Sequence, residues 1–549
     1  MVQEPQTLFL YNAGMLTEQM VVDTLNDGPF DTLSNNLYPV ILQELPTLEN
    51  GGASLQSVSV RSGDRYLNEN GEVAFWGGSE TTMDQLVASF RLRNGLMWSD
   101  GTPLTADDSV FGYEVARSDL ASAFSYYFRA ERTASYVAID DQTVLWTGVP
   151  GYLDPLYDQN FFPPLPRHAY GSLTVEQIFY SEDATRYPLS WGPFRITEWD
   201  AGLQIVTERN PYYYRASEGL PYLDGVVFHF YSDAGALLQG LLDGQCDIGT
   251  QDAGWANILD QVKEVEALGL VTLYGATIPV FEHLDFNLQP ADGQYAFFTD
   301  VNVRRAAAHC IDRQGLINEV QYGIGTPPDS FVFPGQAVYY EGLNQPYPFD
   351  PALGRSLLDA AGWQDTNGDG VVEKDGQKFS VTYYTRNTTL RQQIATYVAQ
   401  QLNDNCGIEV SIQALSNSEL FGTYPDGPVY GRKFDLAGFS WSIFGETPVC
   451  DLYTTSNIPN ADNPQGWNVT GFSDLLFDQV CERALSSLYS DERYSNALVA
   501  QQIFSDELPS LLLFWRVSLI IARPQVTGIL FDGSASSELW NIEQIDVTR

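Results

Sequence analysis

The sequence has 549 residues, with 28 Lys or Arg against 70 Asp or Glu, so its formal net charge is −42. Because nucleic-acid binding depends on clustered basic residues that displace counterions, this charge argues against a nucleic-acid partner. A hydrophobic fraction of 44% and an aromatic fraction of 13% indicate a folded chain of several structural modules. The longest apolar run, residues 511–522, is interrupted by Arg516 and Ser518 and is too short to span a membrane.

The first half of the chain alternates strand and helix patterns. Residues 90–93 read as a short strand, and Thr105 with Asp108 forms a capping-box pattern that begins a helix running to about residue 117. Residues 192–208 predict a hairpin. A strand at 226–230, a helix at 234–242 and a strand around Asp247 and Ile248 follow.

The second half predicts longer helices and a parallel sheet. Asp300 is the expected N-cap of a single helix over 300–320, and Asp350 followed by Pro351 begins a helix that Gly362 ends. Strand patterns at 379–383 and 408–412 flank a helical stripe at 390–402, which is typical of a βαβ unit with parallel strands. The sequence therefore predicts a mixed α/β fold.

Cysteine and histidine usage gives little support to enzymes or metal sites. The five cysteines contain no Cys-x-x-Cys pair, and the four histidines are isolated from one another. An odd count allows at most two disulfides; we expect Cys450 to pair with Cys481, with buried free thiols as the alternative. His-Glu-x-x-His, P-loop and Gly-x-Ser-x-Gly motifs are all missing, so we expect no catalytic residues.

Five spaced blocks of sequence resemble one protein family. They are FRLRNGLMWSDGTPLTADDSV (90–110), GPF with ERNPYY (192–194, 208–213), LLDGQCDI (241–248), FN with DVNVRRA and IDR (286–287, 300–306, 311–313), and YPFDP with AGW (347–351, 361–363). In this order they closely resemble the family 5 extracellular solute-binding proteins, the dipeptide and oligopeptide receptors of ABC importers. Much of this matching sequence is expected to be scaffold, including the turn at 99–101 and the helix that carries Arg304.

The resemblance implies an α/β, two-lobed periplasmic-binding-protein fold of type II in its large cluster C form. It implies lobe I from residues 1–45, 180–275 and 515–549, an extra subdomain at 46–179 and lobe II at 276–514. It also implies a monomeric receptor without a required cofactor, which closes over a peptide and delivers it to the permease subunits of an ABC importer. We expect the protein to lie outside the cytoplasm, in the periplasm or at the cell surface, with a lipid anchor on a removed N-terminal segment.

Residues 439–448 occupy the place of a family segment in which an aspartate pairs with the α-ammonium of a peptide. Here Phe444 stands at the aspartate position, and Glu446 is the nearest substitute, with a solvent-facing carboxylate as the alternative. Trp441 is a candidate pocket wall or a core residue. Asn468, in a loop that resembles a second family element, is a further candidate contact.

The missing aspartate leaves the ligand class open. An oligosaccharide such as a β-glucan fragment is the closest rival, because 11 Trp and 31 Tyr offer rings for stacking. Nickel or haem capture is weaker, because only four histidines are available as ligands. A two-carboxylate hydrolase lacks any motif. A structural cell-surface protein is a further alternative, and no ligand would raise the melting temperature of such a protein.

Residues 365–376 resemble a calcium-binding loop. Oxygen ligands are expected from Asp365, Asn367, Asp369 and the carbonyl of Val371, which occupy positions 1, 3, 5 and 7. The twelfth position is glycine, so Glu373 or Asp375 would have to complete the shell of a structural Ca²⁺. The alternative is a loop without an ion, held by Asx turns.

Overall fold

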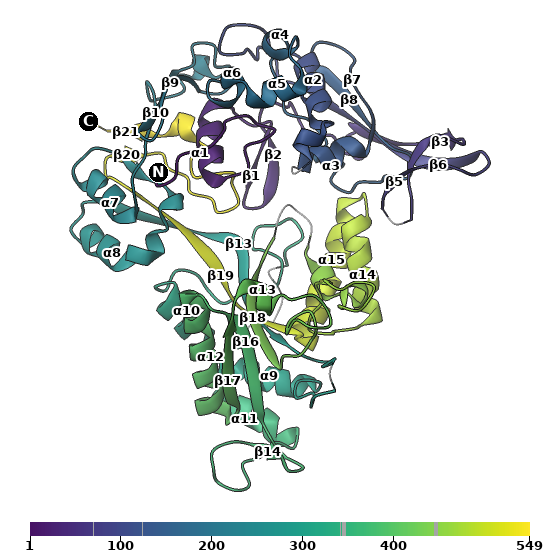
Figure 1. The fold of residues 1–549 in the computed structure, drawn as a ribbon, viewed down its shortest axis with the longest axis vertical. Helices are drawn as coiled ribbons and strands as arrows, with labels where there is room; N and C mark the ends of the chain where they lie inside the picture. The colour runs from purple at the N-terminus through teal and green to yellow at the C-terminus, as the bar shows by residue number, and fades with distance from the viewer. Residues whose placement is uncertain are drawn as a thin grey trace. The chain divides into compact units, whose positions relative to one another are not determined.

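The computed structural model describes residues 1–549 except 70, 123–124, 292, 341, 343–346, 444–447 and 549. The chain forms two compact units: unit 1 is Met1–Ala276 with Ser518–Arg549, and unit 2 is Thr277–Val517. The chain passes from one unit to the other within two strands, β13 (Thr272–Phe286) and β19 (Ser510–Ala522) (Figure 1). The finer division expected from the sequence, with a separate subdomain at 46–179, stays a prediction.

Within the described residues, the larger sheets that lie wholly in unit 1 are antiparallel and ordered β3-β6-β8-β7 and β11-β10-β9, and the pairs β1-β2, β4-β5 and β20-β21 form two-stranded sheets. Its strands are β1 (Phe30–Leu33), β2 (Asn36–Pro39), β3 (Ala53–Val60), β4 (Arg65–Leu67), β5 (Val73–Phe75), β6 (Thr81–Arg91), β7 (Thr133–Ala138), β8 (Thr143–Gly148), β9 (Phe194–Asp200), β10 (Gln204–Arg209), β11 (Val227–His229), β12 (Ile248–Gly249), β20 (Val526–Thr527) and β21 (Asp546–Val547). Its helices are α1 (Leu16–Leu25), α2 (Ala106–Ala116), α3 (Ser125–Glu131), α4 (Arg167–Tyr170), α5 (Val175–Tyr180), α6 (Glu182–Thr185), α7 (Ala234–Leu242) and α8 (Leu259–Ala267).

Local sequence signals explain several of these elements. The Asp108 carboxylate accepts a hydrogen bond from the Thr105 backbone N–H at 2.9 Å, so the predicted capping box does begin α2. Gly202, at φ +74°, turns the predicted β9–β10 hairpin, and Gly244, also at φ +74°, follows the end of α7. Residues of α1, β9, β10 and the C-terminal segment form one apolar core of unit 1.

Unit 2 is built on the strands β19-β13-β18-β16-β17 of a six-stranded sheet, whose sixth strand, β12, pairs with the unit 1 end of β19. Besides β13 and β19, the strands of unit 2 are β14 (Glu373–Lys374), β15 (Gln377–Lys378), β16 (Ser380–Arg386), β17 (Glu409–Leu415) and β18 (Leu436–Ser442). Its helices are α9 (Val301–Cys310), α10 (Arg313–Val320), α11 (Pro351–Ala360), α12 (Thr389–Cys406), α13 (Asn417–Leu420), α14 (Leu475–Ser486) and α15 (Ser490–Glu507). Strand β16 pairs in parallel with β17 and with β18, so the βαβ prediction is confirmed.

The single helix expected over 300–320 is wrong. The structure has two helices there, because the chain leaves the helical conformation at Ile311 and Asp312 starts α10 as a new N-cap. The Asp312 carboxylate accepts a hydrogen bond from the Gly315 N–H at 2.9 Å. The spacing of apolar residues can continue through such a break, because it shows which residues are buried and does not show where the backbone leaves the helical conformation.

Two disulfides lie within apolar cores of unit 2. Cys450 and Cys481, with Cα atoms 5.7 Å apart, join a short 3₁₀ turn to α14, so the expected pairing is confirmed. Cys310 and Cys406 join α9 to α12. Cys246, in unit 1, is a free and partly buried thiol. Among the described residues, no helix is both long and apolar enough to cross a membrane.

Candidate functional site

The candidate site lies at the carboxyl end of β18 in unit 2. Because β16, β17 and β18 run in parallel, their carboxyl ends share one edge of the sheet, where ligands commonly bind in α/β folds. Strand β18 pairs with the antiparallel strand β13, which places Phe281 opposite Trp441 and Glu282 opposite Ser440. Alternation along the strands therefore gives this edge an aromatic face and a charged face.

Trp441 lies in an aromatic group on one face of β18. Its ring centroid is 5.6 Å from that of Phe439, 6.4 Å from that of Trp467 and 6.5 Å from the nearly parallel ring of His283. Trp441 is partly buried, while Trp467 is 47% exposed. The sequence offered two alternative roles for Trp441, core packing and a pocket wall. Both are compatible with this arrangement, because part of the aromatic group is buried and part faces solvent.

Glu282 is the centre of a charged cluster on the other face. Its side chain is 1% exposed, and its Oε1 accepts a hydrogen bond from Arg516 Nε at 2.6 Å. Its Oε2 pairs with Arg391 Nη1, and Arg391 Nη2 donates to Ser440 Oγ at 3.0 Å. Two guanidinium groups therefore surround one buried carboxylate, and the three groups carry a net charge of +1.

Burial shapes the electrostatics of this cluster. Desolvation, followed by repulsion from Arg516, lowers the pKa of Arg391 to about 9, and desolvation also lowers the pKa of Arg516. A third of the Arg516 side chain is exposed, against 6% for Arg391. Arg516 is thus the cationic group through which the cluster can meet an anion from solvent.

Sequence reasoning missed this cluster. The signal for it in the sequence is Arg516, a charged residue inside the mainly apolar run 511–522. Glu282 lies on β13 and Arg391 on α12, more than a hundred residues apart, and the packing of α12 against the sheet brings them together. A charged residue at an inward position of a strand points to a buried partner elsewhere in the chain.

Asn468 is fully buried and holds its own loop together. Its Nδ2 donates to the carbonyl oxygens of Thr454 and Phe472 at 2.9 and 2.8 Å, and its Oδ1 accepts from Thr470 Oγ1 at 2.8 Å. These bonds occupy the polar atoms of the amide, and a ligand contact by Asn468 stays a prediction. Residues Phe444 and Glu446 lie outside the described part of the chain.

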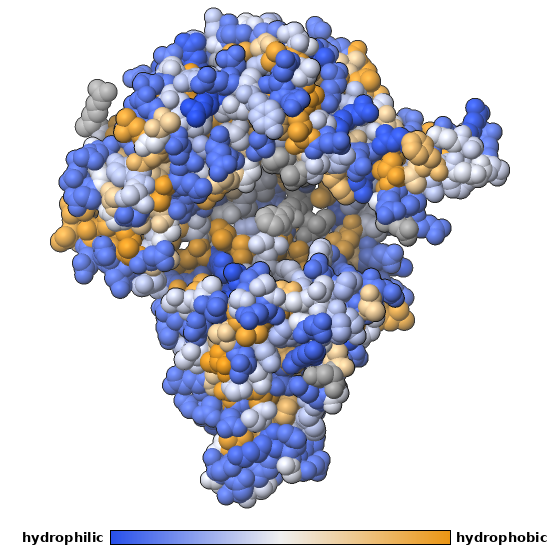
Figure 2. All heavy atoms as spheres, in the orientation of Figure 1, coloured by the Kyte–Doolittle hydropathy of each residue, from blue (hydrophilic) through white to orange (hydrophobic). Residues whose placement is uncertain are grey.

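The loop predicted to bind calcium is held by Asx turns. Asp365 accepts hydrogen bonds from the N–H groups of Gly368 and Gly370, and Asn367 accepts one from Asp369. Figure 2 shows hydrophilic residues over the end of unit 2 where Figure 1 places β14, which adjoins this loop.

Several of the possible metal ligands of this loop are engaged within the protein, whereas Glu373 Oε2 is buried without a hydrogen-bond partner in the described structure. Asp369 Oδ1 accepts from the Val371 N–H at 3.1 Å, and Asp369 Oδ2 pairs with Lys378 Nζ at 2.7 Å. Glu373 Oε1 accepts from the Thr366 N–H at 3.2 Å. Within the described residues, no group of three His, Cys, Asp or Glu side chains is arranged to hold a metal ion.

Comparison with known proteins identifies the family. The model of the bacterial extracellular solute-binding proteins, family 5, matches residues 75–462, well over half of the chain. The chain belongs to this family. The membership predicted from the five sequence blocks is confirmed, and family 5 proteins are solute-binding receptors that act outside the cytoplasm.

Related proteins match this chain over most of its length. The oligopeptide-binding protein AppA of Bacillus subtilis is 27% identical over 475 residues, which cover 84% of this chain and 80% of AppA. The solved structure of B. subtilis AppA in complex with a nonapeptide has a TM-score of 0.58 at 23% identity and covers 100% of this chain and 98% of its own. NikZ from Campylobacter jejuni, in complex with Ni(L-His), has a TM-score of 0.60 at 17% identity, covering 99% and 98%. The expected α/β, two-lobed fold is confirmed, while the different ligands of these neighbours show that fold alone does not define the ligand.

Proposed function

We propose that this solute-binding protein captures peptides outside the cytoplasm and delivers them to the membrane permease of an ABC importer. Family membership supports the receptor role, and the likeness to AppA supports a peptide ligand. Affinity would come from burying the peptide during hinge closure, and the closed form would be the one that the permease recognises.

The charged cluster around Glu282 is the observation that favours a peptide over an oligosaccharide as the ligand. A peptide brings a terminal carboxylate and a row of amide groups, whereas an oligosaccharide brings neutral hydroxyls. A partly exposed guanidinium whose position is fixed by a buried carboxylate suits a carboxylate ligand, because charge-assisted hydrogen bonds are the stronger ones. In this proposal Arg516 binds the carboxylate of the peptide, and Trp441 with Trp467 contacts its side chains.

The remaining sequence predictions fit this role. Glu446 would pair with the peptide ammonium, and Phe444 and Asn468 would border the ligand. The receptor would act as a monomer without catalysis, held at the membrane by a lipid on its N-terminal side, with residues 46–179 as an extra subdomain. The two disulfides support an oxidising compartment, which suits an extracytoplasmic protein.

Calorimetric titration with matched ligands tests the peptide assignment. We expect pentapeptides with a free carboxyl terminus to bind at least tenfold more tightly than the same peptides with a C-terminal amide, and cello-, xylo- and malto-oligosaccharides not to bind. Arg516→Gln should abolish the preference for the free acid. Trp441→Ala should weaken every peptide about fivefold or more, while Trp76→Ala, on the surface of unit 1, should not. Binding of oligosaccharides alone would refute the peptide ligand and leave the receptor fold intact.

We also retain the structural Ca²⁺ ion predicted for residues 365–376 as a proposal. Its support is the pattern of oxygen-bearing side chains at alternate positions, and the occupied Asx turns and the Asp369–Lys378 ion pair weigh against it. Ca²⁺ would have to displace Lys378 from Asp369. If the ion binds, 1 mM CaCl₂ should raise the melting temperature relative to EDTA, and Asp369→Asn should remove that increase. Equal melting temperatures would mean that the loop works without an ion.

A further inference from the structure

Unit 1 contains a cavity of about 350 Å³ that is lined by the edge strands of two sheets. Strand β11 is an edge of the β11-β10-β9 sheet, and β12 is an edge of the six-stranded sheet. Residues of both strands line the cavity. Its volume lies within the range of about 300–1,000 Å³ that is common for ligand pockets.

The cavity combines an apolar interior with access from solvent. The buried part of its lining, no residue of which is more than 4% exposed, includes Leu237, Val526, Leu539, Ile542 and Ile545. Other lining residues are exposed, namely Val227, Gln245 and Asp247. A ligand with apolar side chains can therefore enter from solvent and bury them against apolar residues of unit 1.

Strand β11 pairs with β10 through one side of its backbone. The carbonyl oxygen of Val226 accepts a hydrogen bond from a backbone N–H of β10 at 2.9 Å, and the Phe230 N–H donates to the carbonyl oxygen of Leu203 at 3.0 Å. Alternate residues of a strand direct their backbone groups to opposite sides. Val227 and His229 therefore direct theirs away from β10, and we call this side the outward edge of β11.

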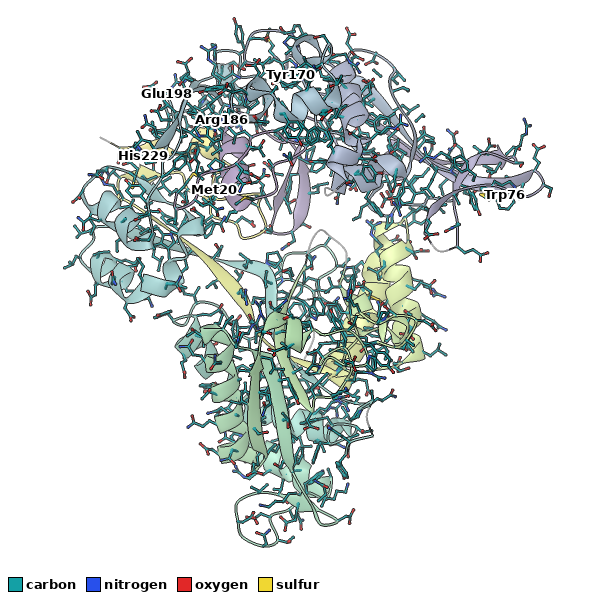
Figure 3. All side chains as sticks on the ribbon, in the orientation of Figure 1. Met20, Trp76, Tyr170, Arg186, Glu198 and His229 are labelled. Carbon is teal, nitrogen blue, oxygen red and sulfur yellow. A yellow bond between two sulfur atoms is a disulfide. The ribbon has the colours of Figure 1, made fainter. Side chains whose placement is uncertain are left out.

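The main chain of Met1 is already paired with the outward edge. The Met1 nitrogen donates to the carbonyl oxygen of His229 at 3.0 Å, and the Met1 carbonyl oxygen accepts from the Tyr231 N–H at 2.9 Å. A residue bonded in this way to two residues that flank a third has the pattern of a parallel ladder. Figure 3 labels His229, the last residue of β11. Met1 also lines the cavity, so this ladder begins inside it.

The rest of the outward edge offers unused backbone groups. Among the described residues, no hydrogen bond reaches the N–H groups of Val227 and His229 or the carbonyl oxygen of Val227. If the ladder continues on the amino side of Met1, the second residue before Met1 meets the Val227 carbonyl and the His229 N–H. The fourth residue before Met1 then meets the Val227 N–H.

An extended peptide suits this site better than a compact apolar molecule. Both would fill the apolar interior, but only a peptide backbone supplies donors and acceptors in the order that a strand edge requires. The same backbone directs alternate side chains to opposite faces, so one set can enter the cavity while the other faces away from it.

We propose that this unit 1 cavity binds an extended peptide segment, which pairs as a parallel strand with the outward edge of β11 and buries apolar side chains against Leu237, Leu539 and Ile542. The segment can be joined to the Met1 nitrogen or can belong to a separate peptide, since both present the same backbone chemistry. If it belongs to a separate peptide ligand, the inference rests on the proposed function.

The first arm of the test joins a short segment to the amino side of Met1. Val-Thr-Val-Thr-Val and Thr-Val-Thr-Val-Thr favour strands and present valine to either face, and Gly-Ser-Gly-Ser-Gly is the flexible control of equal length. We expect one alternating segment to raise the melting temperature by at least about 3 °C over the control. It should also slow hydrogen exchange at the Val227 and His229 amides at least about tenfold.

The second arm adds the same pentapeptides, acetylated and amidated at their ends, to the chain without an added segment. A separate peptide that binds here should slow exchange at the same two amides at least about tenfold. Its backbone N-methylated analogue should not, because it lacks the N–H groups that pair with β11.

His229→Pro is the matched control for both arms. Proline is tolerated where the N–H of an edge strand points away from the sheet, so this variant loses the outward N–H and keeps the ladder with β10. It should abolish the gain in melting temperature and the slowed exchange at Val227. Thermal unfolding of the variant without an added segment checks its fold. If it does not fold, the comparison of alternating and Gly-Ser segments in the parent chain still decides.

The outcomes separate this inference from the proposed function. Slowed exchange in the first arm supports a joined segment, and slowed exchange in the second arm supports a separate peptide. No slowing in either arm overturns the inference and leaves peptide capture by unit 2 untouched. Slowing at Val227 that survives His229→Pro overturns it as well. If a joined segment slows exchange while no separate peptide binds anywhere on the protein, the inference holds and peptide capture is refuted.

Discussion

The guanidinium of Arg304 closes the carboxyl end of α15 by donating from Nε to the carbonyl oxygen of Glu507 at 2.9 Å. Arg304 also donates to the carbonyl oxygens of Phe298, Thr299 and Leu508, and only 2% of the residue is exposed. This arginine belongs to one of the five sequence blocks that identify the family. Its hydrogen bonds are to backbone carbonyls of unit 2, and it also pairs with the Glu507 carboxylate at 3.6 Å, which agrees with the expectation that the helix carrying Arg304 serves as scaffold.

We expect Arg304→Met to lower the free energy of unfolding by about 3 kcal/mol or more, because it leaves several buried carbonyl groups without donors. Arg305→Met is the matched control. Arg305 is only partly buried and donates to the Asp506 carbonyl in an exposed position, so its loss should cost less than about 1 kcal/mol. Urea denaturation followed by circular dichroism measures both values. Equal losses would mean that Arg304 does not hold α15.

Local sequence patterns predicted most of the helices and strands, whereas features that depend on contacts between distant residues were not predicted. The capping box at Thr105, the N-cap at Asp350 and the pairing of Cys450 with Cys481 were all expected, since each depends on a short sequence pattern or a plausible spacing. The break at Asp312 was missed, because the apolar stripe continues through it. The sequence named Trp441 as a candidate, and its contact with a ligand stays a prediction. The Glu282 cluster is assembled by strand pairing and by the packing of α12 on the sheet, which a single sequence does not reveal.

The Glu282 cluster should respond unequally to loss of its members. Glu282→Gln leaves two buried or partly buried guanidinium groups without a counter-charge and should cost about 3 kcal/mol or more. Arg391→Met leaves a neutral Glu282–Arg516 pair and relieves the repulsion that lowers the pKa of Arg391, so it should cost only about 1–2 kcal/mol. Chemical denaturation of both variants at pH 7 gives the order. A larger loss for Arg391→Met would show that the carboxylate does not balance the pair.

Thiol counting tests the disulfides directly. The chain has five cysteines, and the structure pairs four of them, leaving Cys246. Protein unfolded in guanidinium without reductant should therefore react with one equivalent of a thiol reagent, and reduced protein with five. Because the two bridges close long loops, reduction should lower stability by about 3–5 kcal/mol for each. Three free thiols before reduction would mean that one of the two bridges does not form.

The carboxylates of Asp27 and Asp31 in unit 1 should make the protein less stable as the pH rises from about 4 to about 8. Asp31 and Asp27 have pKa values raised to about 8 and about 6 in the folded protein, above the value of about 3.9 expected when unfolded. Between these values the folded state binds more protons than the unfolded state, so raising the pH favours unfolding. Above the folded pKa values both states are ionised, and this contribution becomes constant.

Asp31→Asn isolates this effect. The variant cannot ionise at residue 31, so relative to the parent it should be stabilised at pH 8 by at least about 1 kcal/mol more than at pH 5, since one pKa unit corresponds to about 1.4 kcal/mol. The exposed Asp224→Asn control should show no such difference between the two pH values. Urea denaturation at pH 5, 6, 7 and 8 measures the four curves for each protein. A constant difference between parent and Asp31→Asn would show that Asp31 is ionised over this whole range and that its pKa is not raised.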